Sequence, residues 1–133
     1  AASKIRALIK NCHSKLDAPF DGEESITLYA DLEAGISGSM SSALLPEKIA
    51  PVIEYFLNDE KENAEETYNH ILPLINFENR QCGFRGTKTV MKEGGVIKSD
   101  FCRHPIKPLD EVTKQLLFSF AKKHDLLTYK WGK

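Results

Sequence analysis

The distribution of apolar residues predicts a helix and then a short strand at the beginning of the chain. We expect the helix to have Ser3 as its N-cap and to end near His13. Its buried face follows the i, i+3, i+4, i+7 spacing and consists of Ile5, Leu8, Ile9 and Cys12. A short extended segment is expected over residues 18–21, because Pro19 restrains its own φ and disfavours helix at the preceding residue, and Gly22 ends it.

A second helix and a second strand follow. The helix is expected to start at Glu23, because this side chain and that of Glu24 suit the positive end of a helix, and to stop at Gly35. Its apolar positions are Ile26, Leu28, Tyr29 and Leu32. Residues 35–43 are too rich in Gly and Ser for a helix, so we expect a tight, buried strand there that ends in a hydroxyl-lined loop.

Pro46 then begins a third helix with strong periodicity. Its apolar positions are Ile49, Val52, Ile53, Phe56 and Leu57. The order helix, strand, helix, strand, helix favours parallel β/α units. Two strands alone cannot make the covered sheet that such units require.

Beyond Asn58 and Asp59 the pattern predicts helices only. The first has a kink at Pro73 and an apolar stripe at Ala64, Thr67, Tyr68, Ile71, Leu72 and Ile75. The next stops at residues 94–95 and has on one face Phe84, Thr87, Lys88 and Met91. The last starts at residues 110–111, runs toward Leu127 and has its stripe at Val112, Leu116, Leu117 and Phe120.

Composition and charge exclude some classes of function. The chain has 133 residues, and its 18 Lys and Arg nearly balance 19 Asp and Glu. We find no basic run dense enough to hold a phosphate backbone, so nucleic acid is not an expected partner. Apolar runs fall short of the roughly 18 residues of a membrane span, and residues 1–6 lack the apolar core of a signal peptide. We therefore expect a soluble, cytoplasmic protein that has no membrane partner.

The cysteines and histidines indicate no metal site or nucleophile. Cys12, Cys82 and Cys102 form no C-x-x-C pair and no zinc-ligand pattern, so we expect three reduced, mostly buried thiols. The 4 histidines are scattered, and no Ser or Cys is joined to any of them by a nucleophile motif. We predict no catalytic residue, metal ligand or cofactor within the chain.

Several short motifs, taken in their order and spacing, resemble the dihydrodipicolinate synthase and N-acetylneuraminate lyase family. The most specific is a helical Lys88, the helix-ending Gly95, Arg-His-Pro at residues 103–105 and Pro-Leu at residues 108–109. Residues 20–24 resemble the seventh barrel strand and its loop. Other segments resemble the eighth strand with the turn into it, residues 32–41, and the first accessory helices, residues 58–75.

The resemblance implies an α/β fold, in which the last two β/α units of a TIM (β/α)8 barrel are followed by a C-terminal helical appendage. We expect the barrel part in residues 1–58 and the appendage in residues 59–133. Members of the family form a Schiff base between a lysine and a 2-oxo acid, commonly pyruvate. By the register, that lysine falls just before Ala1, and neither Lys4 nor Lys10 is assigned its role, because both are expected on a helix.

The resemblance also implies that the chain contributes one edge of an active site at the C-terminal ends of the strands. Gly22 would let the backbone approach a bound oxo acid, or is a plain turn glycine. Glu24 matches a carboxylate that reaches substrate hydroxyls in sugar-acid lyases, or is a solvated charge at a helix N-terminus. Met40, Ser41 and Ser42 match the end of strand eight, where they line the pocket; the alternatives are core packing for the methionine and helix capping for the serines.

The implied function is aldol cleavage, condensation or dehydration of pyruvate or a 2-keto-3-deoxy sugar acid, and the expected partner is this small 2-oxo acid. Residues 23–25 and the serine-rich turn look closer to enzymes of sugar-derived acids than to the lysine-biosynthesis members. We expect homo-oligomers, dimers or tetramers. The alternative is a non-catalytic helical interaction module derived from such an enzyme. We favour a fragment of a full enzyme, since an open barrel segment exposes strand edges and apolar surface.

Two residues near the C-terminus are expected to be structural. Arg103 is predicted to anchor the C-terminal segment through carboxylate or carbonyl contacts. Trp131 is predicted to dock on the barrel or on a neighbouring subunit, because a large apolar ring would otherwise lie at a fraying terminus.

Overall fold

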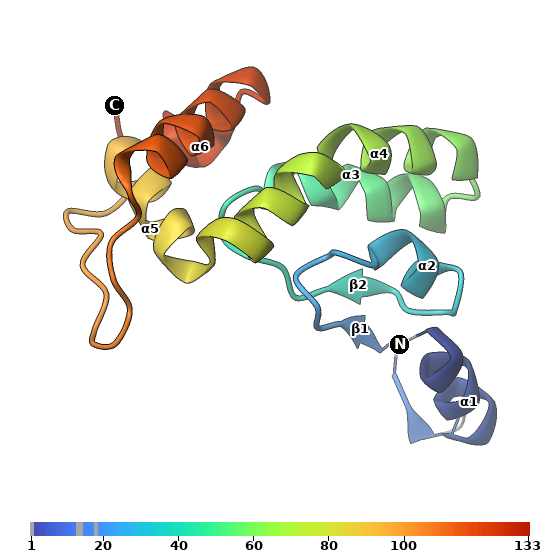
Figure 1. Cartoon of the computed structure of the whole chain (residues 1–133). Helices are drawn as coiled ribbons and strands as arrows, with labels where there is room; N and C mark the ends of the chain where they lie inside the picture. The colour runs from blue at the N-terminus through green and yellow to red at the C-terminus, as the bar shows by residue number, and fades with distance from the viewer. Residues whose placement is uncertain (1, 13–14, 18) are drawn as a thin grey trace. The chain divides into compact units, whose positions relative to one another are not determined.

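The chain forms two compact units, which are described separately. The computed structural model describes residues 2–12, 15–17 and 19–133. The first unit comprises Ala1–Ser41 and Ile49–His70, and the second comprises Ser42–Lys48 and Ile71–Lys133. Figure 1 shows the order of the helices and strands along the chain. Among the described residues, no helix combines the length and apolar character needed to cross a membrane.

The first unit contains two short parallel strands. β1 (Phe20–Asp21) pairs with β2 (Gly38–Ser39), so that Phe20 lies opposite Gly38 and Asp21 opposite Ser39 (Figure 1). Gly38 leaves room for the Phe20 ring, because a Cβ added there would lie 2.8 Å from it. The predicted strands and their parallel pairing are confirmed, although both strands are shorter than the segments predicted for them.

The helix between the strands begins later than predicted. Residues 23–27 form turns, and α2 (Leu28–Leu32) follows Thr27. Glu24 and Ser25 have φ angles of 57° and 66°, in the left-handed region that a right-handed helix cannot contain. Glu24 therefore does not lie at the helix N-terminus, where it was predicted. The predicted stop is confirmed, since α2 ends just before Gly35, whose φ is 104°.

Helix α1 (Ala2–Cys12) forms where it was predicted, but Ser3 lies inside it and does not cap it. Its apolar stripe is not buried, because none of the side chains of α1 is buried and Leu8 is 46% exposed. Ile9 makes the close approach to the rest of the unit, where a Cβ at Gly35 would lie 2.7 Å from its Cδ1. The predicted helix end at His13 and strand start at Ala18 lie outside the described residues.

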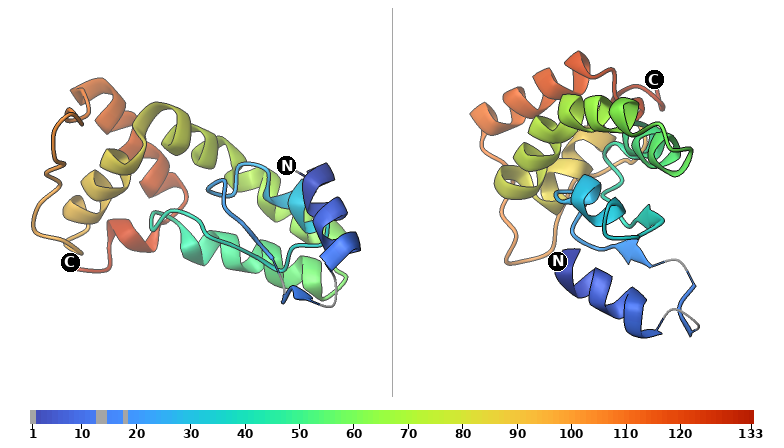
Figure 2. Two further views of the ribbon diagram at one scale, coloured as in Figure 1. Left: turned by 90° about the horizontal axis from the view of Figure 1, so that it is seen from below. Right: turned by 90° about the vertical axis from the view of Figure 1, so that its right-hand side faces the viewer.

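Two long helices follow, and both confirm predictions. α3 (Pro46–Leu57) begins at Pro46, and α4 (Lys61–Phe77) reverses the chain direction after the turn at Asp59, as the two views of Figure 2 show. α4 runs through Pro73, where an interruption was predicted, and continues into a π-helical turn, η2 (Glu78–Cys82). Among the buried apolar residues of α4 are Ala64, Tyr68, Ile71, Leu74 and Ile75.

The second unit is built from α5 (Phe84–Glu93), α6 (Glu111–Lys123) and a 3-10 turn, η3 (Leu127–Tyr129). α5 ends at Gly94, as predicted. A Cβ at Gly94 would overlap the Thr128 carbonyl oxygen, and the Gly132 amide donates to the Gly94 carbonyl at 2.8 Å. Glycine therefore lets the last turn of the chain pass directly over the end of α5.

Helix α6 starts as predicted, but its buried face matches the predicted stripe only at Leu117. The Asp110 carboxylate caps it by accepting from the Thr113 amide at 2.9 Å, and hydrogen bonds from Thr113 hold the pKa of Asp110 below its ordinary value. Val112 is 81% exposed, whereas the buried residues are Leu117, Phe118 and Ala121. The helix ends at Lys123, before the predicted Leu127, because Asp125 has a φ of 48°.

The burial of the cysteines differs from expectation. All three thiols are free, but only Cys82 is buried, while Cys12 and Cys102 are half-buried. Burial raises the pKa of the Cys82 thiol to about 11. Trp131 is 70% exposed in this chain, and its docking on the barrel or on a neighbouring subunit stays a prediction.

Candidate functional site

The candidate site is the edge at which the two parallel strands end. Because β1 and β2 are parallel and in register, their carboxyl ends meet there, and the loops that follow them are neighbours. The Met40 amide donates to the Asp21 carbonyl at 2.8 Å and continues the pairing one residue beyond β2. The first unit thus presents the 22–27 loop and the segment after β2 at one edge.

A buried carboxylate, Asp21, organises this edge and is 3% exposed. Its Oδ1 accepts from the Glu23 amide at 2.9 Å, and its Oδ2 accepts from the Ser25 amide at 3.0 Å. The Ser39 hydroxyl lies 3.2 Å from Oδ2 as a third donor. Asp21 therefore holds the backbone on both sides of Glu24 and joins the 22–27 loop to β2.

The serine hydroxyls complete the connection between the two strand ends. Ser25 Oγ and Ser39 Oγ are 2.7 Å apart. Because Ser39 donates its single proton to Asp21 Oδ2, the proton shared between the serines comes from Ser25. The chain of donors therefore runs from Ser25 to Ser39 to Asp21.

Tyr68 of α4 binds the C-terminal part of the 22–27 loop. Its hydroxyl donates to the Ile26 carbonyl at 2.5 Å and lies 3.1 Å from the Ser25 carbonyl. The ring is 6% exposed and stacks on Tyr29, with centroids 6.4 Å apart. Burial raises the pKa of Tyr68 to about 12, so the phenol is a neutral donor at physiological pH.

Four of the five predicted site residues lie on these two loops. Gly22 is exposed, and a Cβ built there would meet nothing within 4 Å, so the backbone at this position faces open space. Glu24 is exposed in its left-handed conformation. Met40 is 66% exposed and Ser41 is half-buried.

The fifth residue, Ser42, begins the second unit and makes a local contact. Its Oγ accepts from the Leu44 amide at 3.2 Å, the turn-capping contact that is the alternative to a pocket role. This contact uses the hydroxyl as an acceptor and leaves its proton available to another group.

Sequence patterns missed the residues that hold the site together. Their hydrogen bonds join positions that are 4 to 43 residues apart along the chain, and the residues are Asp21, Ser25, Ser39 and Tyr68. The one local signal is the Asp-x-x-x-Ser spacing at residues 21–25, which is typical of a carboxylate that accepts from backbone amides just after it.

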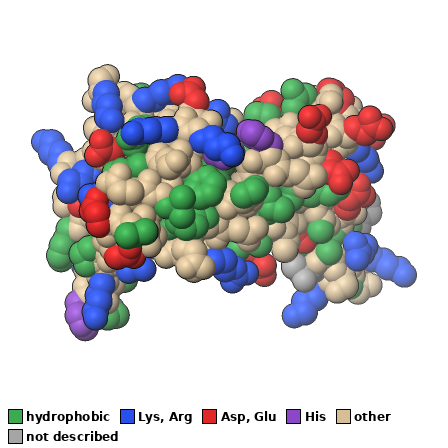
Figure 3. All heavy atoms as spheres, turned by 45° about the horizontal axis from the view of Figure 1, so that its top comes forward, with side chains coloured by type: hydrophobic (Ala, Val, Ile, Leu, Met, Phe, Trp, Pro, Cys, Tyr) green, Lys and Arg blue, Asp and Glu red, His purple; other side chains and the backbone are tan. Residues whose placement is uncertain are grey.

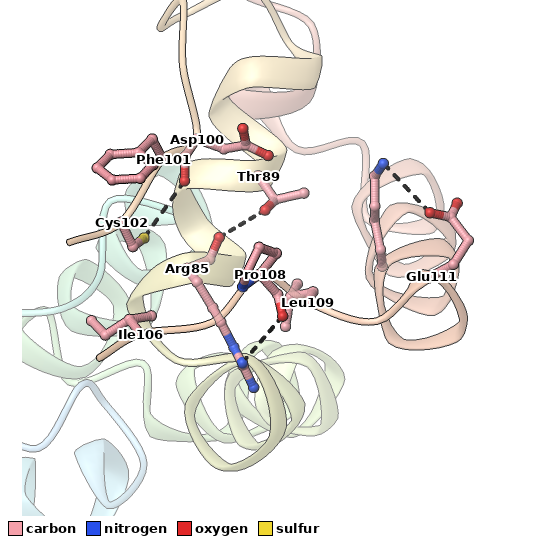
Figure 4. A pocket seen from close by; sticks show the side chains of 10 residues that line it. Arg85, Thr89, Asp100, Phe101, Cys102, Ile106, Pro108, Leu109 and Glu111 are labelled. Atoms are coloured by element: carbon pink, nitrogen blue, oxygen red, sulfur yellow. Dashed lines mark hydrogen bonds and ion pairs between the residues drawn. The ribbon is translucent and has the colours of Figure 1, made fainter. Parts of the chain in front are cut away.

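The second unit has a cleft of about 330 Å³ between α5, the 96–110 segment and the start of α6 (Figure 4). The Arg85 guanidinium donates to the carbonyls of Cys82 and Lys107 at 3.1 and 2.9 Å. Arg85 thus anchors this segment. That role was predicted for Arg103, whose side chain is exposed. Because the Arg85 guanidinium donates to backbone carbonyls, the presence of this charged group in the cleft is explained by a structural role.

The surface charge is mixed in sign. On the face shown in Figure 3, Lys and Arg side chains are interspersed with Asp and Glu. This distribution is consistent with the near balance of 18 basic and 19 acidic residues.

A parallel β/α unit with polar loops at the carboxyl ends of its strands is the arrangement found in β/α-barrel enzymes. The profile of the dihydrodipicolinate synthetase family matches residues 2–124 of this chain. The chain belongs to that family. The predicted resemblance is therefore confirmed.

A relative of known activity is also similar in sequence. The chain is 42% identical over 132 residues to L-2-keto-3-deoxyarabonate dehydratase of Azospirillum brasilense, which covers 99% of the chain. The chain spans 43% of that enzyme's length.

Solved structures agree on the fold. Dihydrodipicolinate synthase from Rhodopseudomonas palustris has a TM-score of 0.82 at 22% identity, with 92% of this chain and 42% of that one covered. The chloride-inhibited enzyme from Acinetobacter baumannii in complex with pyruvate has a TM-score of 0.78 at 22% identity, with 93% and 42% covered. The chain thus has the fold of a part of these TIM-barrel enzymes.

Proposed function

We propose that the chain is the C-terminal part of a dehydratase that removes water from a 2-keto-3-deoxy sugar acid through a lysine Schiff base. The observation that carries the proposal is the 42% identity to L-2-keto-3-deoxyarabonate dehydratase over 99% of the chain. Dehydration is preferred over aldol cleavage or condensation for the same reason. The reacting lysine lies outside this chain.

The described lysines support placing the reacting amine elsewhere. A Schiff-base lysine of a barrel enzyme projects from a strand into the site at the strand ends. β1 and β2 contain no lysine, and Lys4 and Lys10 are exposed on α1. An iminium at C2 of the substrate acidifies the proton on C3, so that the C3 proton and the C4 hydroxyl can leave together as water. The remainder of the barrel must supply that iminium.

In this proposal the chain contributes the substrate-binding edge. Gly22 gives the backbone access to the oxo acid, Glu24 accepts from substrate hydroxyls, and Met40, Ser41 and Ser42 line the pocket with carbonyls and hydroxyls. The open space at Gly22 and the exposure of Glu24 and Met40 support these roles. A hydroxyl-rich substrate suits a carboxylate and serines, because each can form hydrogen bonds with it.

We further propose that residues 1–58 complete a barrel as its last two β/α units, with residues 59–133 as the helical appendage. The unburied apolar stripe of α1, with Leu8 46% exposed, supports additional barrel elements against it. A cytoplasmic homo-oligomer, a dimer or a tetramer, is part of the same proposal. One solved relative is described as the first monomeric dihydrodipicolinate synthase variant, with a TM-score of 0.80 at 23% identity, covering 96% of this chain and 43% of its own.

The experiment is an assay of the intact protein on L-2-keto-3-deoxyarabonate, with product identified by mass. Release of one water with carbon number unchanged is expected. Formation of pyruvate and an aldehyde would identify an aldolase instead. No reaction with this or other 2-keto-3-deoxy sugar acids would favour the non-catalytic module.

A further inference from the structure

We propose that Asp21 is a positioning residue: its carboxylate fixes the backbone of Glu24 and thereby sets the direction in which Glu24 reaches the substrate. The substrate contact rests on the proposed function. The conformational part of the inference rests on the geometry of the first unit alone.

The loop after β1 has a conformation that its residues do not favour by themselves. Glu24 and Ser25 have φ angles of 57° and 66°. The left-handed region is unfavourable for residues with a Cβ, and two such residues in succession are uncommon. Specific contacts must therefore hold this loop.

Asp21 supplies those contacts on both sides of Glu24. One carboxylate oxygen accepts from the Glu23 amide at 2.9 Å and the other from the Ser25 amide at 3.0 Å. Since Asp21 is 3% exposed, water cannot readily replace the carboxylate as acceptor. The Glu24 peptide is thus held between two charge-assisted hydrogen bonds to one side chain.

The proton count excludes this cluster as a proton donor. Three donors point at the Asp21 carboxylate, and an ionised carboxylate has no proton to give. The Ser39 proton goes to Asp21 and the Ser25 proton to Ser39, at 3.2 and 2.7 Å. The cluster can hold the loop, but it presents no proton outward.

The variant Asp21→Asn tests the role with little change in shape. An amide can place its oxygen where Oδ2 accepts from Ser25 and Ser39, but its NH₂ group then faces the Glu23 amide, donor against donor. We expect kcat/KM for the 2-keto-3-deoxy sugar acid to fall about 10- to 100-fold, the range for a lost hydrogen bond to a charged group. Borohydride trapping of pyruvate, which needs no contact to substrate hydroxyls, should stay near the wild-type level.

A double-mutant cycle separates positioning from general damage. If Asp21 acts through Glu24, Asp21→Asn in a Glu24→Ala background should lower kcat/KM further by less than about 3-fold, because coupled residues are not additive. Full additivity of the two losses would overturn the proposal. Asp31→Asn is the matched control, since Asp31 is 1% exposed in the same unit and accepts from Thr27. An equal loss of kcat/KM in this control would also overturn the proposal.

Amide hydrogen exchange gives a readout that needs no activity. In the intact protein, Asp21→Asn should speed exchange at the Glu23 amide, which loses its acceptor, by about 10-fold or more, and Asp31→Asn should not. If the wild type turns over no sugar acid, the proposed function fails, and this exchange still decides whether Asp21 holds Glu24. Unchanged exchange in Asp21→Asn would overturn the inference, whatever the activity.

Discussion

Replacing Tyr68 by Phe removes one hydroxyl and keeps the ring. The hydroxyl donates to the Ile26 carbonyl at 2.5 Å and lies 3.1 Å from the Ser25 carbonyl, while the ring stays stacked on Tyr29. A buried acceptor that loses its donor costs about 1–3 kcal/mol. We therefore expect Tyr68→Phe to lower the free energy of unfolding by about 1–3 kcal/mol at pH 7.

The difference between the two proteins should depend on pH. Burial raises the pKa of Tyr68 from its ordinary value of 10.0 to about 12. The unfolded chain therefore loses this proton first, and the stability that the buried neutral phenol contributes is complete below pH 10 and is lost as pH rises to about 12. Two pKa units correspond to about 2.7 kcal/mol. Phe does not titrate, so the advantage of the wild type should shrink across this window by up to that amount.

The assay is denaturant unfolding of the intact protein and of Tyr68→Phe at several values between pH 7 and pH 11. Taking the difference at each pH cancels the titration of groups that both proteins share. Tyr55→Phe is the control, because Tyr55 is 36% exposed and its change should be worth less than about 0.5 kcal/mol. A wild-type advantage that stays constant from pH 8 to pH 11, or no advantage at pH 7, would refute the reasoning.

Three further predictions concern the site and its supports. Glu24→Gln should lower kcat/KM for the 2-keto-3-deoxy sugar acid about 10-fold and leave borohydride trapping of pyruvate intact; equal loss of both would show damage to the barrel. Gly38→Ala should destabilise the protein by about 1–3 kcal/mol in denaturant unfolding, because its Cβ would lie 2.8 Å from the Phe20 ring, and the added change Phe20→Leu should recover part of the loss. Iodoacetamide at pH 8 should modify Cys82 last of the three cysteines, since burial raises its pKa to about 11; rapid labelling of Cys82 in the folded protein would contradict this.

The sequence predicted those parts of the fold that local chemistry determines. Pro46 starts α3, α6 starts at residues 110–111 and Gly94 ends α5, each as expected. A missing amide hydrogen, a capping carboxylate and an absent Cβ act within a few residues, so their effect can be read from neighbours in the chain. The family resemblance also came from spacing along the chain.

The burial of helical faces could not be predicted in the same way. The spacing of Val112 and Leu116 is helical, but the buried face of α6 is centred on Leu117, Phe118 and Ala121. Adjacent apolar residues give two overlapping stripes, and the neighbouring elements decide which stripe is covered. The stripe of α1 is similarly periodic, yet its Leu8 is 46% exposed.

The candidate site was likewise predicted only where local sequence or the resemblance determines it. Gly22, Glu24 and Met40 were located by the resemblance, and the structure places them on loops at one strand edge. The delayed start of α2 was missed, because it depends on the Asp21 carboxylate accepting two amides and on the left-handed backbone of Glu24 and Ser25. The contact between Asp21 and Ser39 depends on strand register, which brings together residues 18 positions apart.

The most direct test of the central claim is to map the Schiff base. The intact protein is incubated with L-2-keto-3-deoxyarabonate and borohydride, digested, and its peptides are identified by mass spectrometry. The account predicts one stoichiometric adduct, on a lysine outside the 133-residue sequence, and none on the lysines within it. A stoichiometric adduct on Lys4, Lys10 or any other lysine of this chain, or the absence of any adduct, would contradict it.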